Sequence, residues 1–291
     1  MTLPPFQLHR PESIEEASAL LDRYGDDAAL YCGGSELVLL MKLGFADYGH
    51  LIDLKGIAEL RKFREEDGYL EIGAAITHRQ LERSPLVQEG WPALAAMERN
   101  VANIRVRTVG SLGGNLCFSD PHSDPATFLL AAEAELVCRR GAVERAIPMA
   151  DFVLGPYQTA LQAGELLTAI RVPALPSEAV MVHRKLAFRE RPAATVTVLI
   201  RVEDTKVAEG RVAVGSVGVT PSRATQAEEM LAGLSIDAPD SAAVEAAGEA
   251  AAEVANPVAD LNGSTEYKRN LIRVLVKRCF DEARQRASQT R

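Results

Sequence analysis

Two glycine-rich segments carry the clearest chemical signal in this chain of 291 residues. The first, Gly33-Gly34-Ser35, lies between a short apolar run and a stretch with helical apolar spacing. The second, residues 108–118, is dense in glycine but flanked by apolar residues. Because glycine has no Cβ, backbone N–H groups at such turns can approach a phosphate closely. Two turns of this kind can share the two phosphates of a pyrophosphate.

Neither segment matches either of two common glycine-rich nucleotide-binding motifs. Residues 33–35 and 110–115 belong neither to a G-x-G-x-x-G dinucleotide fingerprint nor to a G-x-x-x-x-G-K-S/T phosphate loop. A Rossmann fold and an ATPase are therefore not indicated. A single Gly-Gly pair is more often an ordinary turn. The prediction of an anion site thus rests on the two segments together.

The elements around the first segment predict how it is held. Residues 28–32 form a short apolar run typical of a strand, and Leu37, Leu40 and Met41 give the spacing of a helix. Residues 51–54 predict a further strand, which closes a βαβ-like unit. The amides of the glycine turn then point at an anion with the positive end of a helix behind them.

Capping residues predict where several helices begin. Ser13, Thr77 and Asp124 each precede or open an apolar-periodic stretch, and Pro125 suits the first turn of a helix. The expected elements of this part are helices at 13–24, 78–83, 91–101 and 124–132 and strands at 69–73 and 135–138.

The pattern changes near residue 168. Three segments, 170–173, 194–202 and 211–219, predict strands of an antiparallel sheet. An alanine-rich helix at 242–255 and a long closing helix after residues 262–264 follow. Prolines near residue 175 supply a boundary, so we expect a first domain at 1–175, with subdomains of about 1–55 and 56–175, and a second at 176–291.

Composition excludes several classes of function. A net charge of -8 argues against a basic field for nucleic acid, and the longest apolar runs are far shorter than the roughly 20 residues of a membrane span. The N-terminus lacks the pattern of a secretory signal, so we expect a cytoplasmic protein.

The four cysteines show no C-x-x-C or zinc-finger spacing, which predicts reduced thiols and no metal in this chain. His78 and His122 lie close to the glycine segments, but lone histidines are usually surface or core residues, and neither receives a catalytic role.

The two segments also resemble those of a known family. Residues 32–37 (CGGSEL) are similar to the first FAD-binding loop of the medium subunits of carbon monoxide dehydrogenases and the related xanthine dehydrogenases and other molybdenum hydroxylases. Residues 110–115 (GSLGGN), with Asp120-Pro121 and Asp124, are similar to their second loop. The resemblance runs through nearly the whole chain in order.

The resemblance implies an α+β fold and a cofactor. The implied fold is the vanillyl-alcohol-oxidase (PCMH) type, in which two α/β subdomains clasp FAD, followed by a C-terminal domain with a small antiparallel sheet and helices. No His or Cys here matches a covalent flavin attachment pattern, so the FAD is expected to be non-covalent. The implied cofactor-binding residues are Tyr31, Cys32, Gly33, Gly34, Ser35, Glu36, Leu37, Ser111, Leu112, Gly113, Gly114, Asn115, Cys117, Phe118, Asp124, Leu167 and Lys185. No catalytic residue and no metal ligand is implied, because the flavin carries the redox chemistry.

The resemblance also implies partners. Electrons leave the substrate at a molybdenum cofactor in a large subunit, pass through [2Fe-2S] clusters in a small subunit, and reach this FAD, which reduces an external acceptor. The implied assembly is a dimer of heterotrimers. The substrate and the acceptor stay open, as does the effect of Arg191-Pro192-Ala193, which stand where carbon monoxide dehydrogenase flavoproteins carry a tyrosine near the flavin.

Two other functions stay open at this point. One is a self-sufficient FAD-dependent oxidase or dehydrogenase of the vanillyl-alcohol-oxidase type, which needs its own substrate pocket; residues 175–291 contain no obvious acid and base for one. The other is a binding or assembly module that keeps the fold without the cofactor. The sequence favours the electron-transfer subunit.

Overall fold

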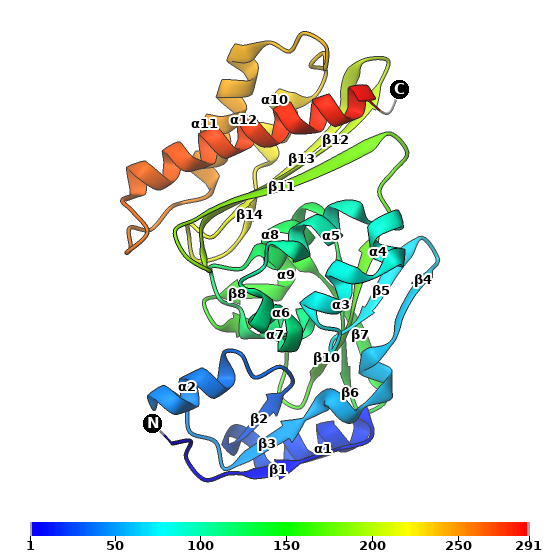
Figure 1. Ribbon diagram of the computed structural model, residues 1–291, viewed down its shortest axis with the longest axis vertical. Coiled ribbons are helices and arrows are strands. Elements are labelled where there is room, and N and C mark those ends of the chain that lie inside the picture. The colour runs from blue at the N-terminus through cyan, green and yellow to red at the C-terminus, as the bar shows by residue number, and fades with distance from the viewer. Residues whose placement is uncertain (1, 290–291) are drawn as a thin grey trace.

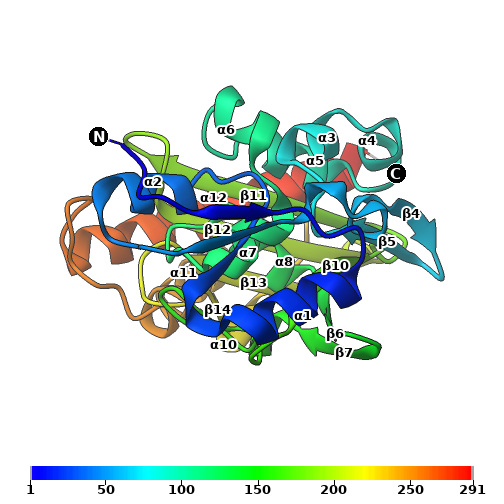
Figure 2. The same ribbon diagram turned by 90° about the horizontal axis from the view of Figure 1, so that it is seen from below.

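The computed structural model describes residues 2–289 and arranges them in three stacked regions, each with its own main sheet (Figure 1). The chain passes once through them, from the N-terminal region at one end of the long axis to the C-terminal region at the other. Figure 2 looks at the molecule from below and shows α1, α2 and the N-terminal strands lying across the other two regions. Within residues 2–289, no helix combines the length and the apolar character that a membrane span needs.

The N-terminal region is a parallel sheet in the order β1-β3-β2. Its elements are β1 (Gln7–His9), α1 (Ile14–Tyr24), β2 (Ala28–Tyr31), α2 (Leu37–Leu43) and β3 (His50–Asp53). The predicted βαβ-like unit is confirmed as β2-α2-β3. Ser13 caps α1 as predicted, since its side chain accepts from the backbone N–H of Glu16. Buried Ile14, Ile52 and Leu60 pack in a core of this region.

The middle region is an antiparallel sheet in the order β4-β5-β10-β6-β7 with helices packed against it. Its strands are β4 (Phe63–Glu66), β5 (Tyr69–Gly73), β6 (Glu135–Arg140), β7 (Val143–Pro148) and β10 (Leu166–Pro173), with a small pair β8 (Val153–Gly155) and β9 (Gln158–Thr159). Its helices are α3 (His78–Arg83), α4 (Pro85–Gly90), α5 (Pro92–Arg99), α6 (Ile104–Val109), α7 (Leu112–Phe118), α8 (Asp124–Ala131) and α9 (Met149–Phe152). Thr77 forms the predicted cap of α3, as part of a capping box with Gln80.

Two predictions for this region are wrong in detail. Asp124 is the first residue of α8 and not its cap, because the Ser123 hydroxyl accepts from the N–H of Ala126. The side chain of Asp124 turns instead to a buried ion pair. Residues 170–173 lie in β10, at the centre of the middle sheet, and do not share a sheet with 194–202.

The C-terminal region is an antiparallel sheet in the order β11-β12-β13-β14, with three helices. Its elements are β11 (Ala179–Ala187), β12 (Pro192–Glu203), β13 (Lys206–Gly215), β14 (Ser222–Arg223), α10 (Thr225–Leu231), α11 (Ser241–Val254) and α12 (Thr265–Gln289). Strand β12 contacts α12 on the outer side and α8 of the middle region on the inner side (Figure 1). Both faces of β12 are therefore covered, which explains why nearly every one of its residues is buried and the usual alternation is missing.

Candidate functional site

The two glycine segments meet in space, although about 75 residues separate Gly33 from Val109 in the sequence. A Cβ built on Gly33 would lie 2.2 Å from the carbonyl oxygen of Val109 and 2.7 Å from the Cα of Gly110. No side chain fits at that distance, so position 33 requires glycine for the two segments to touch. The contact joins the N-terminal region to the middle region.

A cavity of about 270 Å³ lies where these segments meet. The predicted residues that line it are Cys32, Gly33, Gly34, Ser35, Glu36, Leu37, Ser111, Gly113, Gly114, Asn115, Cys117, Phe118 and Leu167. The remaining lining residues are Leu30, Leu54, Leu60, Ala74, Ala75, His78, Val106 and Gly110. The cavity thus joins polar backbone at the glycine segments to a largely apolar wall, a composition typical of cofactor sites.

The first segment offers hydrogen-bond donors that the fold does not use. The backbone N–H groups of Gly34, Ser35 and Glu36 donate to no group in residues 2–289. The Ser35 hydroxyl is buried and also lacks a partner among these residues. Gly34 has φ of +68°, a conformation that favours glycine. A buried hydroxyl without a partner is costly, and the three backbone N–H groups beside it have no acceptor among residues 2–289, so this arrangement favours an anion with several acceptor oxygens.

The second segment contributes differently from the prediction. Gly113 and Gly114 lie inside α7 and not in a bend. The N–H of Leu112 donates to the carbonyl of Ile76 at 3.0 Å, that of Gly113 to Ala74 at 3.2 Å, and that of Gly114 to the Ser111 hydroxyl at 3.1 Å. The expectation that these amides are free for a phosphate is therefore wrong. Because these N–H groups already donate within the fold, the second segment contributes through its shape.

Gly113 shows what that role is. A Cβ at this position would lie 2.6 Å from both the Cβ and the carbonyl oxygen of Ala74. Glycine therefore lets α7 pack directly against the chain that leaves β5. The packing brings Ser111 and Asn115 to the wall of the cavity that Ser35 also lines.

Four predicted residues do not line the cavity. Tyr31 lies behind the first segment, where its ring would be 2.4 Å from a Cβ on Gly34 and the Lys55 ammonium lies 3.8 Å from the ring centroid. Leu112 is fully buried in the core of the middle region. Asp124 and Lys185 bind each other elsewhere.

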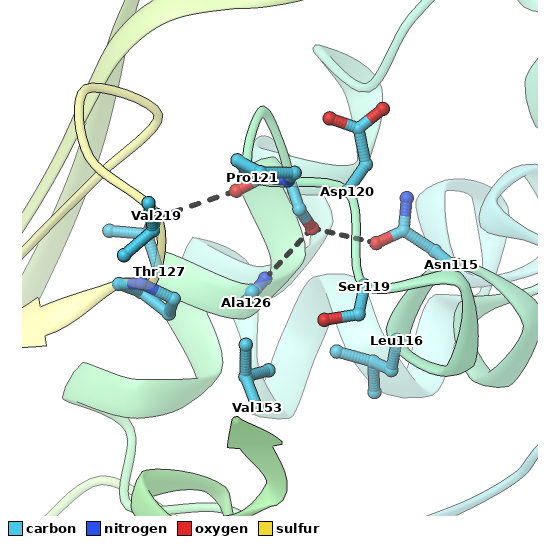
Figure 3. A pocket seen from close by; sticks show the side chains of 11 residues that line it. Asn115, Leu116, Ser119, Asp120, Pro121, Ala126, Thr127, Val153 and Val219 are labelled. Carbon is cyan, nitrogen blue, oxygen red and sulfur yellow. Dashed lines mark hydrogen bonds between the residues drawn. The ribbon is translucent and has the colours of Figure 1, made fainter. Parts of the chain in front are cut away.

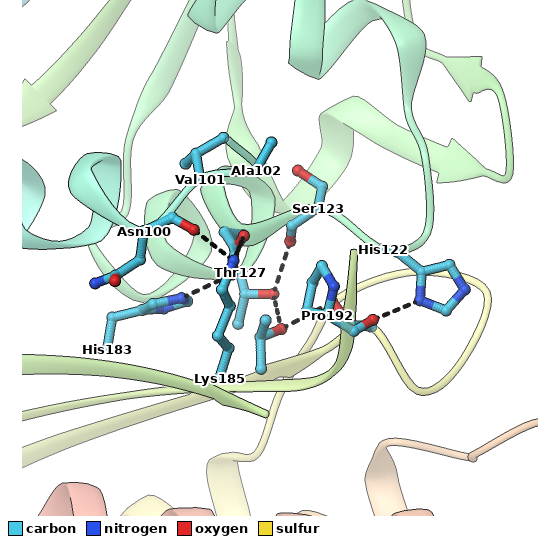
Figure 4. Close-up of polar contacts among 12 residues, drawn as sticks. Asn100, Val101, Ala102, His122, Ser123, Thr127, His183, Lys185 and Pro192 are labelled. Atoms are coloured by element: carbon cyan, nitrogen blue, oxygen red, sulfur yellow. Dashed lines mark hydrogen bonds and ion pairs between the residues drawn. The ribbon is translucent and has the colours of Figure 1, made fainter. Parts of the chain in front are cut away.

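The Asp124 and Lys185 side chains form a buried ion pair between the middle and C-terminal regions. Figure 4 shows Lys185 with its neighbours Asn100 and His183. The Lys185 ammonium donates to Asp124 Oδ2 at 2.8 Å and to the carbonyl of Asn100 at 2.5 Å. His183 Nε2 lies 3.4 Å from the other carboxylate oxygen, and its Nδ1 lies 2.8 Å from the Thr197 hydroxyl. The ammonium and the carboxylate thus have partners within the protein, and their geometry joins two regions of the chain.

A second, much smaller pocket adjoins the large cavity (Figure 3). It has a volume of about 10 Å³, which is space for about one water. Ser123 closes it by donating to Asn115 Oδ1 at 2.7 Å and accepting from the N–H of Ala126 at 3.3 Å. This pocket is too small for an organic cofactor.

Burial raises the pKa of three ionisable side chains at the cavity. It raises the pKa of the Cys117 thiol to about 12 and also raises that of Cys32, which makes both neutral thiols. Burial likewise raises the pKa of Glu36, against the opposing effect of Arg191. Arg191 donates to Glu36 Oε2 at 2.9 Å and to Asp120 Oδ2 at 2.5 Å. Arg191, which belongs to the C-terminal region, therefore binds an acidic side chain of each glycine-bearing region beside the cavity.

Comparisons with known proteins agree with this geometry. The profile of the family described as the FAD binding domain in molybdopterin dehydrogenase matches residues 4–175. The profile of the CO dehydrogenase flavoprotein C-terminal domain matches residues 187–283.

Individual relatives match over almost their whole length. The carbon monoxide dehydrogenase medium chain of Hydrogenophaga pseudoflava is 35% identical over 97% of this chain and 98% of its own. The nicotine 6-hydroxylase medium subunit of Paenarthrobacter nicotinovorans is 31% identical over 97% of this chain and 99% of its own. A solved carbon monoxide dehydrogenase from Hydrogenophaga pseudoflava, a form that lacks the Mo-pyranopterin moiety of the molybdenum cofactor, matches with a TM-score of 0.93 and 37% identity over 97% of this chain and 98% of that one.

Proposed function

The chain belongs to the family of FAD-binding subunits of molybdopterin dehydrogenases, and from that premise we propose that it is the FAD-carrying electron-transfer subunit of a multi-subunit molybdenum hydroxylase. It is an oxidoreductase flavoprotein subunit of the carbon monoxide dehydrogenase and xanthine dehydrogenase type, with the FAD domain followed by a C-terminal domain that holds a small antiparallel sheet. Bound FAD supplies the redox chemistry, taking electrons from one partner and giving them to another.

One observation carries this proposal. Three backbone N–H groups without an acceptor and one buried hydroxyl lie at a cavity whose polar and apolar walls suit a dinucleotide. A diphosphate ester presents several acceptor oxygens and little apolar surface. The N–H groups of Gly34, Ser35 and Glu36 and the Ser35 hydroxyl supply donors of the complementary kind. The residues present therefore fit the diphosphate of FAD.

The rest of the cavity suits the organic parts of the cofactor. Leu54, Leu60 and Leu167 supply apolar surface, and Phe118 supplies an aromatic ring. The neutral Cys32 and Cys117 thiols add no negative charge near the diphosphate. The task of these side chains is to orient the cofactor and to keep water from it.

The assignment of individual residues is part of the proposal. We assign the diphosphate to residues 33–36 and 111–115, and the nucleotide half to Cys117 and Phe118. Tyr31 and Leu112 support these segments from behind. By family resemblance, Asp124 belongs to the nucleotide half, and Leu167 and Lys185 belong to the flavin end. The ion pair between Asp124 and Lys185 gives both side chains a structural role that exists before any cofactor binds.

The relatives are named as medium subunits or chains of larger enzymes. We propose that this chain likewise works with a large subunit that carries the molybdenum cofactor and a small subunit that carries [2Fe-2S] clusters, in a dimer of heterotrimers in the cytoplasm. An external acceptor then oxidises the FAD. The substrate is bound by the large subunit, so the residues of this chain do not select it.

Cofactor binding to the separate chain tests the proposal. The purified protein is expected to carry, or to take up, one FAD that acid releases, because its site is non-covalent. Absorbance between about 350 and 480 nm and flavin fluorescence follow the binding. A folded chain that takes up no FAD would contradict the proposal. Reduction of the FAD-loaded chain by an organic substrate without partners would favour the self-sufficient oxidase instead.

A matched pair of glycine variants locates the site. Gly33→Val places side-chain atoms against Val109, separates the two segments, and is expected to abolish FAD uptake. Gly90→Ala is the control, since a Cβ at Gly90 meets nothing within 4 Å. Both variants must keep the native circular dichroism spectrum. Equal FAD affinity in the two would place the cofactor elsewhere.

A further inference from the structure

A buried histidine-glutamate pair lies at the cavity, with its histidine among the lining residues. His78 opens α3 and Glu98 lies on α5, and their side chains are 2% and 0% exposed. His78 Nδ1 lies 2.7 Å from Glu98 Oε2. The other carboxylate oxygen, Oε1, is buried without a partner in residues 2–289. Two ionisable groups buried at this depth indicate a role for the histidine beyond core packing.

His78 also borders the cavity. His78 lines the cavity, whereas Glu98 does not. A Cβ built on Gly110 would lie 3.5 Å from the ring Cδ2 and 3.3 Å from the Ser35 hydroxyl. Ring atom Nε2, which is bonded to Cδ2, forms no hydrogen bond with any residue in 2–289. One nitrogen thus faces Glu98, and the other has no partner among residues 2–289, in a ring that shares the neighbourhood of Gly110 with the Ser35 hydroxyl.

The chemistry of the cavity calls for a cation at this place. An FAD diphosphate carries about two negative charges at neutral pH. The residues that line the cavity include no lysine and no arginine, as far as the described chain extends. Among them, only His78 can become positively charged. An ionised Glu98 would accept from Nδ1–H of a protonated ring, whose Nε2–H is then a second donor.

On the premise of the proposed function, we propose that His78, positioned by Glu98, is the cationic anchor of the diphosphate: its imidazolium donates from Nε2 to a phosphate oxygen beside Ser35. A neutral ring that keeps its proton on Nδ1 for Glu98 presents a lone pair at Nε2, which repels a phosphate oxygen. FAD binding therefore selects the protonated ring and takes up a proton from solution. The affinity for FAD falls as the pH rises.

The other charged groups near His78 are committed elsewhere. On its own helix, Glu82 pairs with Arg79 at 2.7 Å and with Arg107 of α6 at 3.1 Å. The remaining charged side chains of α3, α4, α5 and α6 are exposed: Arg83, Glu89, Arg99 and Arg105. Across the cavity, Glu36 is the other lining group that can take up a proton, and Arg191 pairs with it. Glu98 is therefore the one charged group in direct contact with the ring among the described residues.

Titrations of FAD and of ADP, which carries the diphosphate without the flavin, test the role of the charge. His78→Ala is expected to weaken both ligands by roughly 10- to 100-fold, the range of a charge-assisted hydrogen bond. Glu98→Gln keeps the shape but not the charge, so it is expected to weaken FAD less and to shift the fall in affinity to lower pH. His9→Ala is the matched control, because His9 binds His50 in the N-terminal sheet outside the cavity lining. An unchanged FAD or ADP affinity in His78→Ala would overturn the inference.

Calorimetry on the unaltered protein keeps the test valid if a variant misfolds. FAD binding measured in buffers of different ionisation enthalpy is expected to take up a fraction of one proton, rising toward about one at mildly alkaline pH. The uptake is expected to vanish in His78→Ala. No uptake by the unaltered protein, or equal uptake in the variant, which assigns the proton to Glu36, would overturn the inference. If the unaltered protein binds no FAD at all, the proposed function itself fails, which is a distinct result.

Discussion

Replacing Lys185 with methionine tests the ion pair that joins the C-terminal sheet to the middle region. The Lys185 ammonium and the Asp124 carboxylate lie 2.8 Å apart, and their side chains are 16% and 4% exposed. At an effective dielectric constant of about 20, two unit charges at this distance attract by roughly 6 kcal/mol. Desolvation of the two ions offsets most of this gain. The intact pair therefore contributes little net free energy of unfolding.

Removing one partner has a larger effect than the intact pair suggests. Lys185→Met leaves the Asp124 carboxylate buried, with His183 at 3.4 Å as its remaining side-chain partner among residues 2–289. A buried charge without its partner costs about 3–5 kcal/mol, and we expect the lower end because Lys185 is partly exposed. The double variant Asp124→Leu with Lys185→Met removes both charges. It is expected to recover most of the lost stability.

Urea unfolding of the FAD-free protein measures these differences. Circular dichroism reports the whole chain, and fluorescence of Trp91, the one tryptophan in the sequence, reports the middle region. Lys277→Met is the control, since the Lys277 and Glu245 side chains lie 3.8 Å apart at 52% and 69% exposure. This variant is expected to change stability by less than about 1 kcal/mol. A loss in Lys185→Met no larger than in the control, or a double variant less stable than the single one, would refute the reasoning.

Three further predictions concern the middle region. Arg145→Leu removes the hydrogen bond that holds the pKa of Glu165 below its usual 4.5, so the variant is expected to be less stable at neutral pH. The difference in stability is expected to shrink as the pH falls below 4.5 through the folded-state pKa of Glu165. Urea midpoints of both proteins from pH 3 to 8 check this, and a difference that stays constant with pH would count against it. Cys117, with a pKa of about 12, is expected to resist a thiol reagent at about pH 8 in the native protein and to react much faster in urea, whereas rapid native labelling of Cys117, located by peptide mapping, would contradict the raised pKa of its thiol. Gly73→Ala places a Cβ 2.2 Å from the backbone oxygen of Leu60 and is expected to destabilise by about 1–3 kcal/mol, while Gly90→Ala, with open space at that position, is not; equal urea midpoints would argue against the close contact.

Features that depend on neighbours in the sequence were predictable. The Ser13 cap and the Thr77 capping box use hydrogen bonds within three residues, which a sequence displays directly. The βαβ-like unit around residues 28–54 follows from short apolar runs separated by a helical pattern. The contact between the two glycine segments was also predicted, from the chemistry that a pyrophosphate demands.

Features that depend on partners far away in the sequence were not predictable. Residues 170–173 read as part of one antiparallel sheet with later strands, but β10 pairs with β5 and β6, and no local pattern specifies that choice. Ser123 and Asp124 are both good capping residues, and the ion pair with Lys185 decides between them. The helical state of Gly113 and Gly114 opposes their low helix propensity and follows from close packing on Ala74. The pairing of His78 was not predictable either, because Glu98 lies 20 residues away in the sequence and reaches the ring only in the folded chain.

A crystal structure of the chain with bound FAD tests the central claim most directly. The account predicts that the diphosphate lies between residues 33–36 and 110–115, with phosphate oxygens accepting from the N–H groups of the first segment and from the Ser35 hydroxyl. The second segment is expected to contribute shape, since its amides already donate within the fold. FAD bound with its diphosphate away from these segments, or held with the Gly34, Ser35 and Glu36 amides still without a partner, would contradict it.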